Sequence, residues 1–366
     1  METHPAEPNQ NSPTLKLLCD PESDHGAGSA LQSLLRNLGE TKRALELRMG
    51  VWRNDAVGAE IGRAILETAE RGVAVRVIKD RSVILRERTH GNRSSFFHSR
   101  LPLGQRLRLA LTGSGSGQRP ERNNVDRSLG ETLRNHPNVT LDWAENVASW
   151  RFVFDERVMI MGCGPMEDSP AMRHDYAIEI AGEANLQRLG QRLSGKREFD
   201  PERSLDFLTN QGDREKPRYE IKKQILRAIA EAKYAVYVEM AAMGDPEVSL
   251  RLIGAARHGV RVKILTARTA EDGAPKNYRA LKELFEAVDM DVYLSDLPVQ
   301  SKLMLFDWKR AILGSADLSG NSMESGEELD IVVHNEPEFL RSLDAEVRRR
   351  LADCERADSV KSLKGC

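Results

Sequence analysis

The spacing of apolar residues alternates between helical and strand-like in two separate stretches of the chain. The first stretch is residues 61–80 (IGRAILETAERGVAVRVIKD) and the second is residues 250–267 (LRLIGAARHGVRVKILTA). Each begins with apolar positions three and four residues apart, which is typical of an amphipathic helix. Each then has a glycine, Gly72 or Gly259, where a helix end favours a left-handed residue. A run rich in β-branched residues follows, so the pattern predicts a helix–turn–strand unit that occurs twice.

A second repeated pattern lies downstream in each half and predicts a β-hairpin. The apolar runs FVFD (152–155) and MLFD (304–307) are each followed by a second apolar run. In both copies seven positions separate the last Asp of the run from a glycine. We expect a tight turn between the two strands, at Glu156-Arg157 and at Trp308-Lys309.

These repeats indicate an α/β fold in which a mixed sheet covered by helices is built twice. Residues 194–217 are polar and lack periodicity, so a linker is expected there. The expected boundaries are a tail at 1–14, an N-terminal half at 15–193, the linker at 194–217, a C-terminal half at 218–357 and a tail at 358–366.

The composition changes this picture little. The chain has 366 residues, is 40% hydrophobic and 30% charged, and has a net charge of -2. Its four cysteines form no Cys-x-x-Cys pair, which favours a reducing compartment. No run approaches the ~18–20 apolar residues of a transmembrane helix, and the first residues lack a signal-peptide layout. We therefore expect a cytoplasmic protein whose contact with membranes, if any, is peripheral.

The polar residues of the second hairpin carry a family resemblance. Lys302, Asp307, Gly314 and Ser315 follow one another at fixed spacing, and Asp317 lies two positions further. This spacing resembles the motif of the phospholipase D superfamily: His-x-Lys, four residues, Asp, six residues, Gly-Ser. The chain looks most like bacterial cardiolipin synthases, over roughly residues 15 to 340. The resemblance implies two phospholipase D-like α/β sandwich halves that face each other in one chain, with the two motifs at a central seam.

Both copies of the motif depart from the family pattern. Gln300 holds the histidine position of the second half, and Ala148 and Trp150 hold the histidine and lysine positions of the first. In such enzymes one histidine attacks phosphorus and the other protonates the leaving alkoxide, which neither an amide nor a methyl group can do. The resemblance therefore implies a pseudoenzyme with no confident catalytic residue. The degenerate motif positions are Ala148, Trp150, Asp155, Gln300, Lys302 and Asp307.

Part of an anion site remains in the second half. The residues expected to bind a ligand are Lys302, Gln300, Ser315 and Asp317. The ammonium of Lys302, the amide of Gln300 and the hydroxyl of Ser315 can each donate to phosphoryl oxygens. The alternative is that these residues are relics, with Asp307 serving only as a turn residue. In the first half, Ala148 and Trp150 favour apolar packing.

The surroundings of the motif leave several partners open. Residues 71–134 contain fourteen Lys or Arg against five Asp or Glu. Such an excess of positive charge attracts anionic groups. The ligand that we favour is a phospholipid headgroup, and a nucleic-acid backbone is the less favoured one. The same excess is also typical of a solvated surface. Phe96-Phe97 could contact a lipid interface or bases, or pack under the loop. A protein partner is a further possibility that the sequence does not identify.

A working enzyme with relocated catalytic residues is the main alternative to a pseudoenzyme. Its candidate histidines are His90, His98 and His174. No cluster of histidines and carboxylates has metal-ligand spacing, and no glycine-rich loop opens a helix, so we expect neither a metal nor a cofactor.

Overall fold

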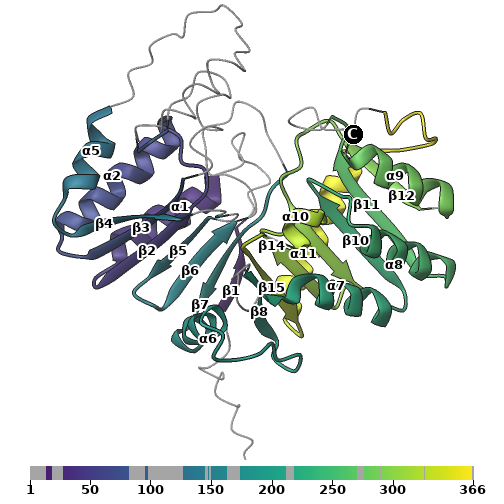
Figure 1. The fold of residues 1–366 in the computed structure, drawn as a ribbon, viewed down its shortest axis with the longest axis horizontal. Helices are drawn as coiled ribbons and strands as arrows, with labels where there is room; N and C mark the ends of the chain where they lie inside the picture. Colours follow the sequence, from purple (N-terminus) through teal and green to yellow (C-terminus); the bar gives the residue numbers. More distant parts are fainter. Residues whose placement is uncertain are drawn as a thin grey trace, which may run out of the picture.

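The computed structural model describes residues 14–18, 28–81, 95–97, 127–144, 147, 150–162, 174–211, 218–269, 276–288, 290–324 and 326–364. They form two mixed β-sheets whose outer faces are covered by helices and whose inner faces meet at a central seam (Figure 1). The predicted α/β fold with two facing halves is confirmed.

The N-terminal sheet has seven strands in the order β1-β7-β6-β5-β2-β3-β4. The strands are β1 (Thr14–Leu17), β2 (Ala44–Met49), β3 (Ala74–Asp80), β4 (Val139–Ala144), β5 (Trp150–Phe154), β6 (Val158–Gly162) and β7 (Ala177–Ala181). Strands β2, β3 and β4 pair in parallel at one side of the sheet, whereas β5, β6 and β7 pair antiparallel. The helices of this half are α1 (Gly28–Glu40), α2 (Ala56–Glu70), α5 (Arg127–Asn135) and α6 (Glu183–Leu193). The first three pack on the outer face, and α6 lies beside the seam.

The C-terminal sheet has nine strands in the order β16-β12-β11-β10-β13-β14-β15-β8-β9. The strands are β8 (Leu205–Gln211), β9 (Arg218–Tyr219), β10 (Ala235–Met240), β11 (Arg261–Ala267), β12 (Asp291–Ser295), β13 (Lys302–Phe306), β14 (Arg310–Gly314), β15 (Glu328–His334) and β16 (Glu355–Arg356). The helices are α7 (Glu220–Glu231), α8 (Pro246–Arg257), α9 (Lys276–Ala287), α10 (Gly320–Glu324) and α11 (Pro337–Ala352). The first four cover the outer face, and α11 contributes to the apolar cluster of the seam. Among the described residues, no helix combines the length and apolar character needed to cross a bilayer.

The repeated helix–turn–strand unit forms as predicted. Helix α2 leads into β3 through Gly72 and helix α8 leads into β11 through Gly259, with φ of 89° and 87°. A side chain at either position would force an L-residue into the left-handed region, so glycine ends both helices.

Both predicted hairpins form, but their turns begin one residue earlier than expected. The residues with positive φ are Asp155 and Glu156 in the first hairpin, and Asp307 and Trp308 in the second. Two successive left-handed residues give the turn whose twist matches a β-hairpin. Asp tolerates this conformation well, which places the motif Asp inside the turn rather than at the end of the strand.

Two of the expected boundaries need correction. The range 194–217 contains strand β8, which is buried and pairs with β15, so much of the expected linker belongs to the C-terminal sheet. The range 358–366 contains Leu363, which is buried in the outer core of the C-terminal half. The sequence at 205–211, LDFLTNQ, is polar at several positions because β8 carries buried, hydrogen-bonded side chains as well as apolar ones.

Candidate functional site at the seam

Two short backbone contacts bring the motif segments together at the seam. Val147 forms a parallel bridge with Glu327, and Val299 forms a parallel bridge with His174. Val147 and Val299 each lie three residues before the motif lysine position of their own half. The first motif segment therefore contacts the residue before β15, the second contacts a residue shortly before β7, and a site here draws on both halves.

Lys302 of the second motif is directed away from the seam cluster. It lies opposite Met240 in the sheet, whereas its neighbour Leu303 lies opposite Glu239 and packs into the seam. Successive strand residues point to opposite faces, so Lys302 points to the other face. Its side chain is 8% exposed, and Nζ donates to the carbonyl oxygen of Gln300 at 2.9 Å.

Ser315 and Asp317, two further residues expected to bind a ligand, already form hydrogen bonds within the protein. The backbone amides of Ser315 and Ala316 donate to Oδ1 of Asp330 at 2.8 and 3.1 Å. The Ser315 hydroxyl donates to Glu328 at 2.5 Å. Asp317 accepts from a backbone amide at 3.2 Å. The carboxyl groups of Glu328 and Asp330 thus accept the hydrogen bonds of Ser315 that we expected a phosphoryl group to accept.

These carboxyl groups are unusually basic because they are buried. Burial raises the pKa of Glu328 to about 8, and the hydroxyl of Ser315 opposes that shift. Burial also raises the pKa of Asp330 to about 7, against the backbone amides and Lys302, which lower it. Both groups therefore bind protons near neutral pH, which limits their mutual repulsion.

The two motif aspartates have the same structural role in the two halves. Asp155 accepts hydrogen bonds from three successive amides ahead of β2, at 3.0, 2.7 and 2.9 Å. Asp307 accepts from the equivalent three amides ahead of β10, at 2.9, 2.7 and 2.9 Å. These amides counteract desolvation and lower the pKa of both carboxyl groups. Through these hydrogen bonds, each aspartate links its hairpin turn to the start of a neighbouring strand.

The lysine position of the first motif holds an apolar, packed side chain. Trp150 is 6% exposed and packs against Phe152, with ring centroids 6.1 Å apart. Its indole lies over Gly162, where a Cβ atom would collide with it. Ala148 lies outside the described residues. The lysine position of this half therefore holds a packed aromatic side chain instead of a cation.

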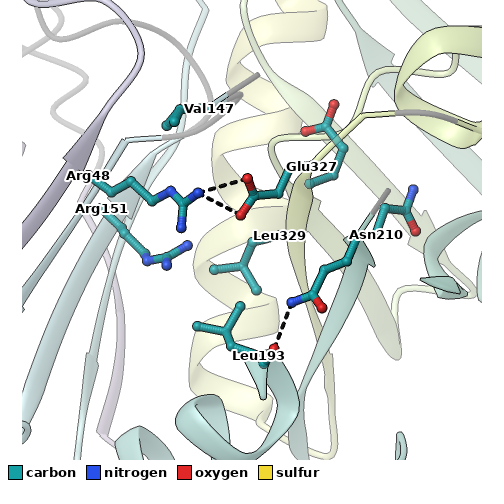
Figure 2. A pocket seen from close by; sticks show the side chains of 9 residues that line it. Arg48, Val147, Arg151, Leu193, Asn210, Glu327 and Leu329 are labelled. Atoms are coloured by element: carbon teal, nitrogen blue, oxygen red, sulfur yellow. Dashed lines mark hydrogen bonds and ion pairs between the residues drawn. The ribbon is translucent and has the colours of Figure 1, made fainter. Parts of the chain in front are cut away.

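Two arginines of the N-terminal half line a small pocket in the seam (Figure 2). Arg48 of β2 and Arg151 of β5 lie directly opposite each other in the sheet. Arg48 forms an ion pair with Glu327 at 2.6 Å. Asn210, Gln211 and Leu193 also line the pocket, which has room for about one water molecule.

Among the described residues, Arg151 forms no ion pair. It is 5% exposed, and its Nε has no hydrogen-bond partner. Burial, followed by the nearby Arg48, lowers its pKa to about 10, while Glu46 and Glu327 act in the opposite direction. A buried N–H group without a hydrogen-bond partner is unfavourable, and Figure 2 shows the Arg151 side chain directed into the pocket. We did not predict these arginines from the sequence; the available signal was a charged residue, Arg151, within the apolar run WRFVF.

On the other side of the seam, α11 contributes to a buried polar network. Glu239 accepts hydrogen bonds from Ser301 at 2.6 Å, Tyr237 at 2.7 Å and Tyr176 at 2.9 Å, and it forms an ion pair with Arg350. Arg350 also donates to the carbonyl oxygen of Asp175 at 2.6 Å. The guanidinium therefore links the two halves.

His174 belongs to the surroundings of this network. Its backbone carbonyl accepts from the amide of Gln300 at 2.8 Å. Burial, followed by Arg350, lowers the pKa of its imidazole to about 4, so the ring is neutral at pH 7. His90 and His98 lie outside the described residues. Within the described part of the chain, no group of three or more His, Cys, Asp or Glu is arranged to hold a metal ion.

The aromatic pair of the basic stretch is packed inside the N-terminal half. Phe96 stacks on Trp52 at 4.4 Å, and Phe97 contacts the same indole edge-on at 5.2 Å. Both phenylalanines are buried, so the surface role considered for them is not available in this structure. Most of the surrounding basic stretch lies outside the described residues.

The comparisons with known proteins agree with the predicted resemblance. Residues 225–351 match the family model described as "Cardiolipin synthase, PLD-like domain". The crystal structure of phosphatidylserine synthase from Haemophilus influenzae Rd KW20 is 12% identical, covers 96% of this chain and 89% of its own, and has a TM-score of 0.68. Polyphosphate kinase from Porphyromonas gingivalis is 13% identical, with coverage of 99% and 53% and a TM-score of 0.56. At these identities the two structures show a shared fold.

A third structure covers less of the chain. Nuc from Salmonella typhimurium, a phospholipase D family member, is 19% identical, covers 42% of this chain and 99% of its own, and has a TM-score of 0.36. A search of curated protein sequences finds no match.

Proposed function

We propose that this chain is a phospholipase D-like pseudoenzyme that binds an anionic phosphodiester in the seam between its halves; residues 225–351, which match the model of a cardiolipin synthase, PLD-like domain, support the family part of this proposal. The binding group is the arginine pair of the seam pocket rather than the lysine of the degenerate motif.

The observation that carries this proposal is the buried guanidinium of Arg151. A buried charge is normally paired, because the loss of hydration is otherwise uncompensated. Among the described residues, only Arg48 of these two guanidiniums forms an ion pair, with Glu327, and the Nε of Arg151 has no hydrogen-bond partner. A phosphodiester would supply the missing negative charge together with acceptors that suit a planar guanidinium.

The residues at the motif positions argue against turnover. Gln300 carries no titratable proton and cannot form a phosphohistidine. The neutral imidazole of His174 lies near Arg350 and Glu239, which stabilise a structural network at the seam. Loss of general acid–base chemistry alone reduces rates by about 10²–10⁴-fold, and covalent catalysis is lost in addition.

The ligand class that we favour is a phospholipid headgroup. The matching family model is named for cardiolipin synthase, whose name refers to a phospholipid. The pocket as it stands admits about one water molecule, so a headgroup enters when Glu327 turns away from Arg48. In this proposal the protein contacts the bilayer only from its surface, by binding the phosphodiester of a lipid headgroup.

Calorimetric titration with a monomeric short-chain phosphatidylglycerol tests the proposal. We expect Arg151→Met to weaken binding at least about tenfold, because it removes a charge-assisted contact of ~1.5–3 kcal/mol. Without ligand, Arg151→Met should unfold at the same or a higher temperature, because methionine fills the space without an unpaired charge. Lys302→Met is the matched cation control and should bind nearly as the unaltered protein does.

Three results would contradict the proposal. The first is unchanged binding by Arg151→Met. The second is turnover of phosphatidylglycerol by the purified protein above an Arg151→Met/Lys302→Met control. The third is Arg151-dependent binding of a single-stranded oligonucleotide with no binding of the lipid, which would assign the seam to nucleic acid.

A further inference from the structure

A separate cavity of about 540 Å³ lies against the C-terminal sheet, where β10 and β11 begin. It is bounded by these strands, by the turn after β13 and by the last part of α11. None of its lining residues lines the seam pocket. The side chains that give it chemical character are Lys233, Tyr234, Arg261, Lys263, Trp308 and Arg348.

Because the two halves are repeats, the charged residues of this cavity can be compared with the equivalent residues of the N-terminal half. Arg76 is the third residue of β3, and Lys263 is the third residue of β11. Arg76 is neutralised on its own sheet, since it bonds to Asp142 at 2.8 Å and to Glu46 at 3.4 Å. In the second half, the positions of these two carboxylates hold Tyr293 and Tyr237.

Lys263 therefore lies among aromatic rings instead of carboxylates. Its Nζ is 5.9 Å from the centre of the Tyr293 ring. Asp291 lies opposite Lys263 in the sheet, but its carboxylate pairs with Arg356 at 2.6 Å. Among the described residues, Lys233, Arg261 and Lys263 have no ion pair, which leaves a concentrated positive charge in the cavity.

Trp308 adds an aromatic surface at a strained position. Its φ is 58°, and a bulky side chain in the left-handed region is a rare arrangement that persists where the surroundings fix it. The equivalent turn residue of the first half is Glu156, with the same φ. The Trp308 ring lies 6.2 Å from Tyr237 with an interplanar angle of 24°, and the Arg348 guanidinium is 6.0 Å from it. Tyr234, at 70% exposure, adds a second aromatic side chain.

We propose that this cavity binds a nucleoside phosphate. The phosphates would bind Lys263, Arg261 and Lys233, and the base would stack on Trp308 beside Tyr234. Aromatic rings next to cations are the combination that binds stacked bases and their phosphates. A volume of about 540 Å³ lies within the range of small-molecule sites. No glycine-rich loop opens a helix in this sequence, so side chains rather than backbone amides would hold the phosphates.

Titration of the full chain with ATP and with inorganic tripolyphosphate, without divalent metal, tests this proposal. The second probe carries the phosphates without a base. We expect ATP to bind at least about tenfold more tightly than tripolyphosphate, because only ATP can stack. Lys263→Gln should weaken ATP binding by about tenfold, whereas Arg76→Gln, the equivalent change in the other half, should leave it unchanged.

A second variant separates stacking from folding. Asn favours positive φ, so Trp308→Asn should keep the turn while reducing ATP affinity to that of tripolyphosphate. Arg151→Met should leave ATP binding unchanged, since it lies in the other pocket. Equal affinity for ATP and tripolyphosphate, an unaltered affinity in Lys263→Gln, or absence of ATP binding would overturn the proposal. Binding of poly-glutamate in place of ATP would overturn it in favour of an acidic peptide.

Discussion

The guanidinium of Arg48 in the N-terminal half and the carboxylate of Glu327 in the C-terminal half lie 2.6 Å apart, across the seam where the two motif segments meet. This ion pair neutralises one of two adjacent guanidiniums. Arg151, directly opposite Arg48 in the sheet, has a buried Nε without a partner. Among the described residues, only one of these two adjacent guanidiniums is therefore held in an ion pair.

The stability of the protein should fall as the pH rises from about 4.5 to 8, in part because of Glu328. Burial raises the pKa of this carboxyl group to about 8 in the folded protein, above its ordinary value of 4.5. In this pH range the folded state holds a proton that the unfolded chain releases, so the contribution is lost as pH rises. Each pKa unit corresponds to ~1.4 kcal/mol, so the effect amounts to a few kcal/mol.

Urea unfolding of the unaltered protein and of Glu328→Gln at pH 5, 7 and 9 measures this contribution. Gln cannot ionise, and Asp330 is present in both proteins. We expect the unaltered protein to lose stability relative to Glu328→Gln across the series. A difference that does not change with pH would show that Glu328 is ionised throughout.

Arg350 should be among the most sensitive positions for stability. Glu239 is fully buried, and Arg350 provides its counter-charge. Arg350→Met leaves that carboxylate uncompensated, which destabilises the fold by about 3–5 kcal/mol in comparable cases. Arg341→Met, an exposed change on the same helix, should have an effect of at most ~0.5 kcal/mol.

A double variant shows whether the loss arises from the buried charge. Glu239→Gln removes the charge, so Glu239→Gln/Arg350→Met should recover part of the stability lost in Arg350→Met. Chemical unfolding of the three variants gives the coupling between the two residues. Strictly additive losses would mean that Arg350 acts through its packing alone.

Gly162 should not tolerate even one methyl group. A Cβ atom there collides with the indole of Trp150, so Gly162→Ala is expected to destabilise the protein by about 1–3 kcal/mol. A smaller side chain at position 150 makes room for the methyl group. The free energies of unfolding of Trp150→Leu, Gly162→Ala and the double variant should therefore be non-additive, with the double variant more stable than the sum predicts. Additive values would contradict the packing described for the first motif.

The repeated units were predictable from the sequence because local patterns encode them. Gly72 and Gly259 mark helix ends that require a left-handed residue, and the apolar runs around residues 152–155 and 304–307 mark hairpins. Each turn begins one residue earlier than we predicted, because the motif aspartate itself has a positive φ. Its carboxylate accepts hydrogen bonds from backbone amides at the start of a strand distant in sequence. That contact is tertiary, and no local pattern contains it.

The candidate site was predictable only in outline. The resemblance placed the motifs at the seam, but the donors of Ser315 are used by carboxylates that follow it in the sequence by more than ten residues. Arg48 and Arg151 belong to different strands, and only the antiparallel pairing of β2 with β5 makes them neighbours. Strand β8 was missed because its apolar residues are interspersed with polar side chains that bond within the interior.

The most direct test of the seam site is to locate a bound anion. Crystals of the full chain soaked in tungstate, a phosphate analogue, would show the metal by its anomalous diffraction. We predict a peak at hydrogen-bonding distance from Nε of Arg151, with Glu327 turned away from Arg48, and no such peak in Arg151→Met. A peak beside Lys302 with none at Arg151 would contradict the account.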